Sequence, residues 1–355
     1  MITEIHYPET LAPEKLDEYL ARGWFRMGAM IFTCHYLCFH NELYSAVWAR
    51  LPLENYRFRK SLRKIINRNR ERFRTITRPA IFDDDKERLY QLHKQRFEGY
   101  IAPTLRESLF GSSDKFDLYN TWETSIYDGD QLIGASFFDL GADSLASIMG
   151  LYDPSYERFS LGFFTMLIEI EHGLQKNMHY YYPGYVVPGY GRFDYKLRIG
   201  SVEYFDVRSK GWYPYEKIVT DDLPSEKLRY QLTLLEDELE HRQLPHDRLV
   251  YQLYDKKLFG FEDMRYYRAP LILRCGVSHD QRKWLVVDFD FIEDHYRVCL
   301  VSRFEEPLAF IYDLFEDVDS DRCILEFLFL KAILLEHEDP IEVAHFIEVA
   351  GRDLR

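Results

Sequence analysis

The sequence predicts an α+β fold with a mixed sheet. Two turn signals, Asp128-Gly129-Asp130 and Gly141-Ala142-Asp143, separate three strand-like segments and favour an antiparallel meander. Immediately afterwards, residues 151–195 have the pattern of a strand, a turn, a helix and a second strand, and such a crossover makes two strands parallel. Antiparallel and parallel pairs in one sheet, preceded by helices, are typical of the α+β class.

Residues 1–80 are expected to form an N-terminal segment. It begins with a short helix, Pro13 to Ala21, and continues with strands from Ala29 to Phe39 and from Trp48 to Leu53. Four possible metal ligands follow one another closely, but their spacing matches no standard zinc motif. We therefore expect no metal site at Cys34, His35, Cys38 and His40.

A basic stretch ends this N-terminal segment. Between Arg57 and Arg78 ten residues are Lys or Arg and only Glu71 is acidic, in a chain whose net charge is −14. At helical spacing the apolar side chains of this stretch pack inward and the basic ones stay in water. The outward face can bind nucleic-acid phosphates or be an ordinary solvated helix face. Its candidate phosphate-binding residues are Arg59, Lys60, Arg63, Lys64 and Arg68.

Residues 81–220 contain the meander and the helix that follows it. A helix from Asp83 to Arg96 precedes strands that end near Tyr127, Asp139 and Tyr152. Pro154 then breaks the last strand, because proline lacks an N–H and restricts the residue before it. The next helix, Leu161 to Leu174, is apolar on most faces and is expected to be buried.

The start of this buried helix is a candidate binding site. Ser160 is a good N-cap residue, and Gly162 lets a ligand approach the first helical turn. A helix N-terminus beside parallel strands suits a phosphate or an acyl carbonyl. Asp153, in the preceding turn, can fix that turn or face a substrate amine, and we favour the turn.

Residues 221–355 form an acidic third region, with 17 Lys and Arg against 30 Asp and Glu. The charge predicts either docking of a protein or a plain solvated surface, since it repels RNA. The expected helices and strands are a helix at 225–242, strands at 270–277, 283–292, 295–304 and 310–314, and helices at 321–337 and 341–350.

Several classes of protein are excluded or disfavoured. The chain lacks a signal-peptide pattern and any run of 18 apolar residues, so we expect a cytoplasmic protein that spans no membrane. Five scattered cysteines indicate no disulfide framework. There is no Walker loop, no Gly-x-Ser-x-Gly, no His-Glu-x-x-His and no Rossmann fingerprint. Transfer of an already activated acyl group, without metal or cofactor, remains compatible with the sequence.

Five short motifs in order carry a family resemblance. They are Tyr152-Asp153-Pro154, Ser160-Leu161-Gly162, Ile170-Glu171, Tyr182 to Tyr185, and Tyr195-Lys196. The chain thereby resembles the arginyl-tRNA–protein transferases and their bacterial leucyl-transferring relatives. Two further matches are weaker: Arg22-Gly23-Trp24-Phe25-Arg26-Met27-Gly28, and Ser61 to Lys64, where Leu62 replaces the usual Gln. The family's N-terminal cysteine cluster is missing here, because no Cys precedes Cys34.

The resemblance implies an N-acetyltransferase-type fold in residues 81–220. It also implies that aminoacyl-tRNA is the co-substrate and that the acceptors are proteins with N-terminal Asp or Glu, as in protein arginylation and N-degron pathways. In this interpretation the basic stretch binds tRNA. The enzyme must orient the ester and the amine, stabilise an oxyanion and remove a proton from an ammonium of pKa ~8.

Candidate roles then follow from position. Glu171 is a base or orients the amine, although pairing with an Arg is an equal alternative. Tyr182, Gly184 and Tyr185 contact the ester and the terminal adenosine, or pack as core aromatics. Lys196, with Arg192 or Arg198, reads the acidic residue of the acceptor. Ser160, Leu161 and Gly162 bind phosphate.

Two other functions remain open. The first is an acyl-CoA-dependent N-acyltransferase, although Tyr156 to Gly162 holds one Gly where CoA-binding loops usually show two. The second is a non-catalytic binding protein on the same fold. Whether Arg or Leu is transferred is not decided by the sequence.

Overall fold

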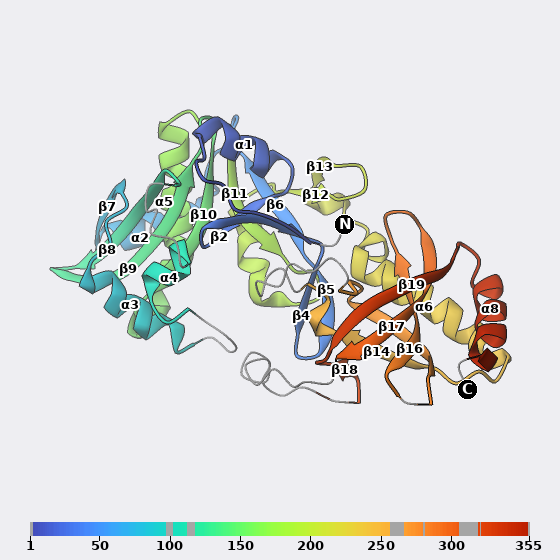
Figure 1. Ribbon diagram of the computed structural model, residues 1–355. Coiled ribbons are helices and arrows are strands. Elements are labelled where there is room, and N and C mark those ends of the chain that lie inside the picture. The colour runs from blue at the N-terminus through green and yellow to red at the C-terminus, as the bar shows by residue number, and fades with distance from the viewer. Residues whose placement is uncertain are drawn as a thin grey trace. The chain divides into compact units, whose positions relative to one another are not determined.

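The computed structural model describes residues 3–96, 102–111, 118–255, 266–279, 281–304, 319 and 321–353 (Figure 1). The chain divides into two compact units. The first unit consists of Ile5–Thr33 and Val47–Ile218, and the second consists of Met1–Glu4, Cys34–Ala46 and Val219–Arg355. The chain therefore passes from the second unit to the first after Glu4, returns to the second after Thr33, and enters the first again at Val47.

An eight-stranded sheet is the centre of the first unit. All its neighbouring strands are antiparallel except β10 and β11, which are parallel. The expected meander and the expected parallel pair are both confirmed. The strand order is β13 (Gly211–Pro214), β12 (Glu203–Asp206), β6 (Val47–Pro52), β11 (Tyr180–Val186), β10 (Ser144–Tyr152), β9 (Gln131–Leu140), β8 (Thr121–Asp128), β7 (Arg74–Pro79).

The crossover between the parallel strands contains the predicted buried helix. After β10 the chain makes a 3₁₀ segment, Pro154–Phe159, then forms α5 (Leu161–Gln175) and returns as β11. Ten of the fifteen residues of α5 are buried. A meander followed by this strand–helix–strand unit is the arrangement of an N-acetyltransferase-type domain, so the predicted fold class is confirmed.

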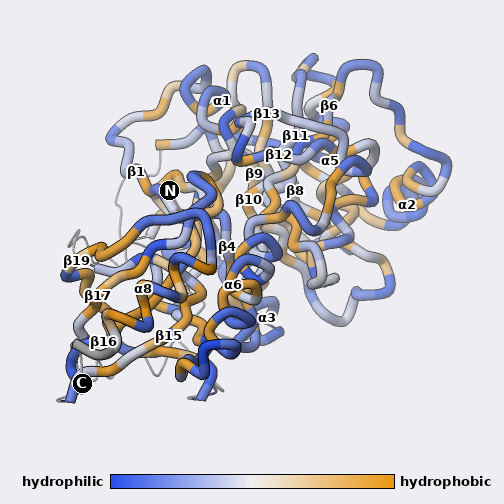
Figure 2. Tube along the Cα trace, turned by 90° about the vertical axis from the view of Figure 1, so that its right-hand side faces the viewer, coloured by the Kyte–Doolittle hydropathy of each residue, from blue (hydrophilic) through white to orange (hydrophobic). Residues whose placement is uncertain are grey.

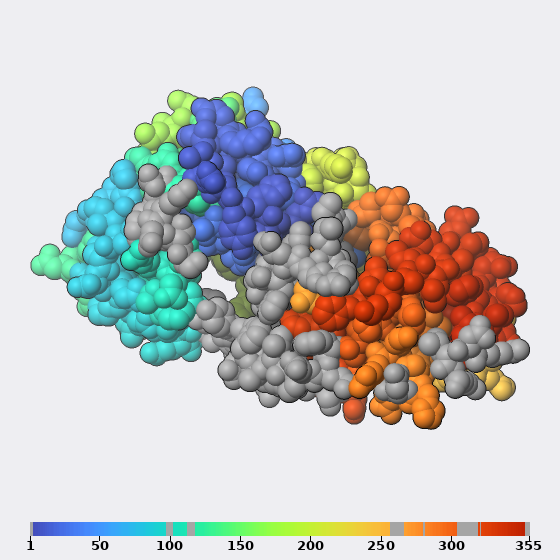
Figure 3. Space-filling model, viewed as in Figure 1, coloured from blue at the N-terminus to red at the C-terminus, as the bar shows by residue number. Residues whose placement is uncertain are grey.

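Helices cover both faces of the sheet, and strand β9 shows why. Phe138 points into the core beneath α5 and α2 (Lys60–Arg70), whereas its neighbour Phe137 points into the core beneath α3 (Asp84–Lys94) and α4 (Leu105–Phe110). Side chains alternate along a strand, so an apolar strand serves two cores. Figure 3 shows α3 and α4, in cyan and teal, at the surface of the unit.

The N-terminal residues of the first unit pack against the sheet through a buried ion pair. Helix α1 (Pro13–Ala21) precedes β2 (Phe25–Met27), and β2 pairs with β3 (Met30–Cys34) in a three-stranded sheet that also includes β1 (Thr3–His6). Arg26 of β2 donates to Asp139 of β9 at 2.8 Å, and both side chains are almost fully buried. Loss of either partner would leave an uncompensated buried charge.

The second unit has a six-stranded sheet of its own. Helices α6 (Pro224–His241) and α8 (Pro340–Asp353) pack on it, and the hairpin of β4 (Tyr36–Phe39) and β5 (Glu42–Ser45) belongs to the same unit. The order is β18 (Cys323–Ile324), β14 (Asp247–Tyr251), β15 (Leu271–Val277), β16 (Lys283–Asp290), β17 (His295–Phe304), β19 (Phe327–His337).

Most elements expected in residues 221–355 are confirmed, and one is wrong. The stretch from Asp321 to His337, expected as a helix, forms the strands β18 and β19 instead. A run of this length favours a helix, but pairing with β17 makes it a strand, in which the side chains after Leu328 are half-buried or exposed. The strand expected at 310–314 lies outside the described residues. The expected strand from Ala29 to Phe39 is also wrong as a single element, because it is divided into β3 and β4.

Candidate active site

A cavity of about 770 Å³ opens in the first unit at the start of α5. Its wall combines basic, apolar and hydroxyl side chains, and the 3₁₀ segment Gly191–Ile199 after β11 supplies several of them. The lining residues are His93, Arg96, Ser147, Ile148, Met149, Gly150, Tyr152, Glu157, Ser160, Gly162, Phe163, Thr165, Met166, Pro183, Arg192, Phe193, Tyr195, Lys196 and Arg198.

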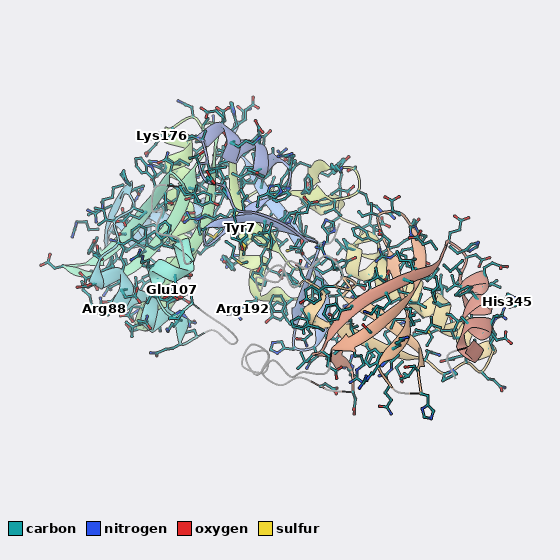
Figure 4. All side chains as sticks on the ribbon, in the orientation of Figure 1. Tyr7, Arg88, Glu107, Lys176, Arg192 and His345 are labelled. Atoms are coloured by element: carbon teal, nitrogen blue, oxygen red, sulfur yellow. The ribbon has the colours of Figure 1, made fainter. Side chains whose placement is uncertain are left out.

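Five of the predicted substrate-binding residues meet in this cavity. They come from two parts of the chain, the helix start and the segment after β11, which the parallel crossover brings together. They are Ser160, Gly162, Arg192, Lys196 and Arg198. Figure 4 labels Arg192 on the segment that follows β11.

The helix start differs from the prediction in one respect. Ser160 is at the predicted N-cap position of α5, but its backbone is left-handed, φ 54° and ψ 47°, and its hydroxyl makes no capping hydrogen bond. The hydroxyl of Ser160 is therefore not used by α5. Gly162 leaves room beside the Tyr152 ring, since a Cβ there would lie 3.5 Å from it. The two residues leave the first turn of α5 open to the cavity.

Hydrogen bonds from the neighbouring helix α2 fix the position of this turn. Arg68 and Asn69 of α2 both donate to the carbonyl oxygen of Phe159 at 3.1 Å. Phe159 precedes Ser160, so α2 holds the chain where it enters α5. Asp153 accepts hydrogen bonds from the backbone and the hydroxyl of Ser155, which is the turn role that we favoured.

Lys196 lies in the cavity wall with its ammonium partly engaged. Nζ donates to the carbonyl oxygen of Tyr185 at 2.8 Å. Burial lowers the pKa of Lys196 to about 7. At neutral pH this side chain is therefore only partly charged, whereas Arg192 and Arg198 carry permanent charges.

The predicted residues of β11 lie beside the cavity without lining it. Tyr182 is 2% exposed and packs edge-on against the rings of Phe25 and Trp212, and burial raises its pKa to about 12. Tyr185 contacts the site through Lys196, which donates to its carbonyl oxygen and lies over its ring. Gly184 has φ +87°, and a Cβ there would lie 3.3 Å from Nζ of Lys196. Leu161 is fully buried in the core beneath α5.

Glu171 is placed away from the cavity. It forms a two-pronged ion pair with Arg70 of α2, one of whose hydrogen bonds measures 2.9 Å. The side chains of Arg70 and Glu171 are 42% and 25% exposed. This is the Arg-paired alternative that the sequence left open, and its geometry offers no contact to a substrate in the cavity.

Sequence reasoning missed the glutamate two positions earlier. Glu169 is fully buried on α5, and its Oε2 accepts from the Tyr181 hydroxyl at 2.8 Å. Its Oε1 has no hydrogen-bond partner within the described part of the chain. Burial raises the pKa of Glu169 to about 7, although neighbouring hydroxyls, including that of Ser147 in the cavity wall, favour the carboxylate. The available signal was a charged residue between Ile168 and Ile170.

Two further lining residues, His93 and Arg96, were missed as well, because they come from α3 and the residues just after it. Arg96 donates to Glu157 at 2.8 Å and also to the Tyr152 hydroxyl. His93 lies deeper, with Nδ1 3.4 Å from the backbone nitrogen of Tyr152, and burial lowers its pKa. Glu157 is the only carboxylate among the described residues that line the cavity, and it is already paired. The cavity is therefore electropositive.

The predicted phosphate-binding residues form an exposed basic surface on and beside α2. Leu62 and Ile66 anchor the helix in the core, and hydrophilic and hydrophobic stretches alternate along it in Figure 2. Arg59, Lys60, Arg63, Lys64 and Arg68 are all exposed. None of the first four is paired with an acid within the described ranges. Phosphate groups can therefore reach these charges.

The Cys and His residues near β3 and β4 do not suit a metal. Burial raises the pKa of Cys34 strongly and that of Cys38 to about 12, so neither thiol readily becomes a thiolate ligand. Burial also lowers the pKa of His35 to about 3. In the described part of the chain, no three His, Cys, Asp or Glu side chains cluster as metal ligands would.

Known proteins match the part of the chain that holds this cavity. A family model described as the C terminus of arginine-tRNA-protein transferase matches residues 82–206. An aspartate/glutamate leucyltransferase of Phenylobacterium zucineum is 30% identical over 174 residues, which is 47% of this chain and 67% of that protein. Another, from Campylobacter jejuni, is 27% identical over 198 residues, which is 54% of this chain and 80% of the relative.

Solved structures resemble the chain only loosely. A GCN5-related N-acetyltransferase from Anabaena variabilis aligns with a TM-score of 0.30 and 12% identity, over 92% of this chain and 73% of that chain. This likeness is too weak to indicate a shared function. Among the helices that the structure describes, none has the length and apolarity needed to cross a membrane.

Proposed function

The chain belongs to the family of arginyl-tRNA–protein transferases and bacterial aspartate/glutamate leucyltransferases, and we propose that it transfers leucine from charged tRNA to protein N-termini. It is an aminoacyltransferase, and aminoacyl-tRNA is its activated co-substrate. The acceptors that we propose are proteins that begin with Asp or Glu, and the compartment is the cytoplasm, where charged tRNA is found.

The chemistry of the cavity wall is the observation that supports leucine. Ile148, Met149, Phe163 and Met166 offer an apolar surface for a branched aliphatic side chain. An arginyl group would need a carboxylate for its guanidinium. The one carboxylate among the described lining residues, Glu157, is held by Arg96. Leucine therefore fits this wall better than arginine.

We assign recognition of the acceptor's acidic residue to the guanidinium groups of Arg192 and Arg198. Arg198 is exposed at the cavity, its guanidinium lies 4.8 Å from the centre of the Phe163 ring, and Arg192 lies on the same segment. A guanidinium recognises a carboxylate through two parallel hydrogen bonds. The open first turn of α5, at Gly162, offers backbone N–H donors to the ester oxyanion or to the terminal phosphate, whereas the N–H of Ser160 already donates to the carbonyl oxygen of Glu157.

The exposed basic surface of α2 is proposed to bind the tRNA backbone. It belongs to the same unit as the cavity, and Arg68 and Asn69 connect it directly to the start of α5. Tyr182 and Tyr185 are proposed to support the wall rather than to react. Glu171 is not included in the proposed catalytic group, because its carboxylate is paired with Arg70.

The experiment is transfer of radiolabelled leucine or arginine from charged tRNA to peptides that start with Asp, Glu, Lys or Ala. We expect label from leucyl-tRNA on the Asp and Glu peptides. The variant Arg198→Glu should reduce this transfer and raise the share of label on the Lys peptide, because the charge at the reading position is reversed. Transfer of arginine alone would refute the choice of leucine. Binding of charged tRNA without transfer to any peptide would indicate a non-catalytic protein.

A further inference from the structure

The position of Lys196 suits a reacting group rather than a simple cation. Its Nζ lies in the cavity wall, 2.8 Å from the Tyr185 carbonyl oxygen, and 5.1 and 5.3 Å from the centres of the Tyr185 and Phe193 rings. Gly184 permits this approach, because any side chain there would press on Nζ. One hydrogen bond orients the nitrogen and leaves its other positions for a ligand.

The surroundings of Lys196 disfavour its charged form. No carboxylate in the described part of the chain forms an ion pair with it. The two neighbouring ring faces attract an ammonium, but burial still lowers the pKa of Lys196 to about 7. The cavity adds further positive charge. Its other charged and titratable groups are His93, Arg96, Tyr152, Glu157, Arg192, Tyr195 and Arg198.

We propose that Lys196 is the base that accepts a proton from the α-ammonium of the acceptor protein before that amine attacks the aminoacyl ester. This assignment rests on the proposed function and changes the role expected for Lys196. Reading of the acidic residue is then left to Arg192 and Arg198, which stay charged at any pH that the protein tolerates.

The protons and bonds of the step balance as follows. Nζ of Lys196 takes the first proton from the ammonium, and the free amine attacks the ester carbonyl carbon. A C–N bond forms, the C–O bond to the ribose breaks, and a second proton passes from nitrogen to the departing ribose oxygen. Lys196 finally releases the first proton to solvent, so one proton is lost per transfer.

The pKa of Lys196 is close to that of the ammonium from which it would take the proton. An α-ammonium has a pKa of roughly 7.7–8.0, close to that of Lys196 in the cavity. A base works best when its pKa lies near the operating pH, and a positioned base contributes roughly 10²- to 10⁴-fold in rate.

The decisive variant is Lys196→Arg, which keeps a positive charge but cannot accept a proton. In single-turnover transfer to an Asp peptide at neutral pH, we expect about 100-fold or greater loss of rate. The matched control is Lys176→Arg on exposed Lys176, labelled in Figure 4, which lies after α5 and away from the cavity and should leave the rate unchanged. Thermal unfolding checks that both variants are folded.

A second acceptor separates proton transfer from binding. An Asp peptide whose terminal amine is replaced by an aminooxy group presents a nitrogen that already lacks the extra proton at neutral pH. We expect the loss in Lys196→Arg to shrink to less than about tenfold with this acceptor. An equal loss with both acceptors would overturn the assignment, as would a variant that transfers at the wild-type rate. Failure of the wild-type protein itself to transfer would instead reject the proposed function, and with it this role.

Discussion

Glu169 and Tyr181 share a hydrogen bond of 2.8 Å in the core between α5 and β11, where both side chains are fully buried. Ser147 lines the cavity and interacts with both Glu169 and Tyr181. The pair therefore lies directly behind the cavity wall. A carboxyl buried in this way makes the stability of the fold depend on pH.

Glu169 should destabilise the folded protein as the pH rises. Its pKa is raised from 4.5 to about 7, so the folded state binds this proton more tightly than the unfolded chain does. The bound proton therefore adds about 3 kcal/mol to the free energy of unfolding. This stabilisation is complete below pH 4.5 and is lost as the pH rises through about 7. Denaturant titrations from pH 4.5 to 8 should show this loss in the wild type and a weaker one in Glu169→Gln. Identical pH profiles would contradict the assignment.

The Arg70–Glu171 pair should matter little for stability or catalysis. Because both side chains are partly exposed, we expect Glu171→Gln to cost less than about 1 kcal/mol. Its transfer rate should stay within about threefold of wild type, because the side chain does not line the cavity. Denaturation and single-turnover rates measure both effects. A 100-fold loss of rate with intact stability would restore Glu171 as a catalytic base.

The basic surface on α2 should bind tRNA in a salt-dependent manner. Replacing Arg59, Arg63 and Lys64 with Glu should weaken binding of charged tRNA. It should also reduce the slope of log K against log salt by about 0.7–0.9 for each lost phosphate contact. Filter binding at several salt concentrations gives this slope. The control is Lys331→Glu, which reverses one exposed charge of β19 in the acidic second unit and should leave the slope unchanged.

Gly184 should be needed for both stability and the position of Lys196. Gly184→Ala forces a left-handed conformation on alanine, at a cost of about 1–2 kcal/mol, and puts a methyl group 3.3 Å from Nζ. We expect a lower Tm and about a tenfold or greater loss of transfer rate. Gly191→Ala is the matched control, because its φ is not in the left-handed range and a Cβ there would be 3.5 Å from Asp194. Equal effects of the two changes would disprove a special role for Gly184.

The local patterns of the first unit could be predicted from the sequence. The turns at Gly129 and Gly141, the proline after Asp153 and the apolar run of α5 each act over a few residues, and the structure confirms the elements that they indicate. The strand β19 could not be predicted, because only its pairing with β17 distinguishes it from a helix.

The site was harder to predict because it depends on orientation. Two residues apart on a helix means about 200° of rotation, so Glu169 and Glu171 face opposite ways. The sequence alone did not say which of them faces inward. His93 and Arg96 come from another part of the chain, and only folding brings them to the cavity. Lys196 was identified, but its lowered pKa follows from burial that no local pattern encodes.

The alternation of the chain between its two units limits how this protein can be divided or built. The hairpin of β4 and β5 is synthesised early, whereas residues that it contacts are synthesised at least 180 residues later. Ser45 bonds to Ser225, and the carbonyl oxygen of Leu43 accepts from Arg229. Glu42 forms an ion pair with Arg322. A ribosome therefore exposes the hairpin long before α6 exists to cover it. A single cut near residue 218 yields no independent C-terminal half, because that half would lack its hairpin. We therefore predict that the acidic region is not a detachable module, and that gene truncations there yield insoluble protein rather than a smaller working enzyme.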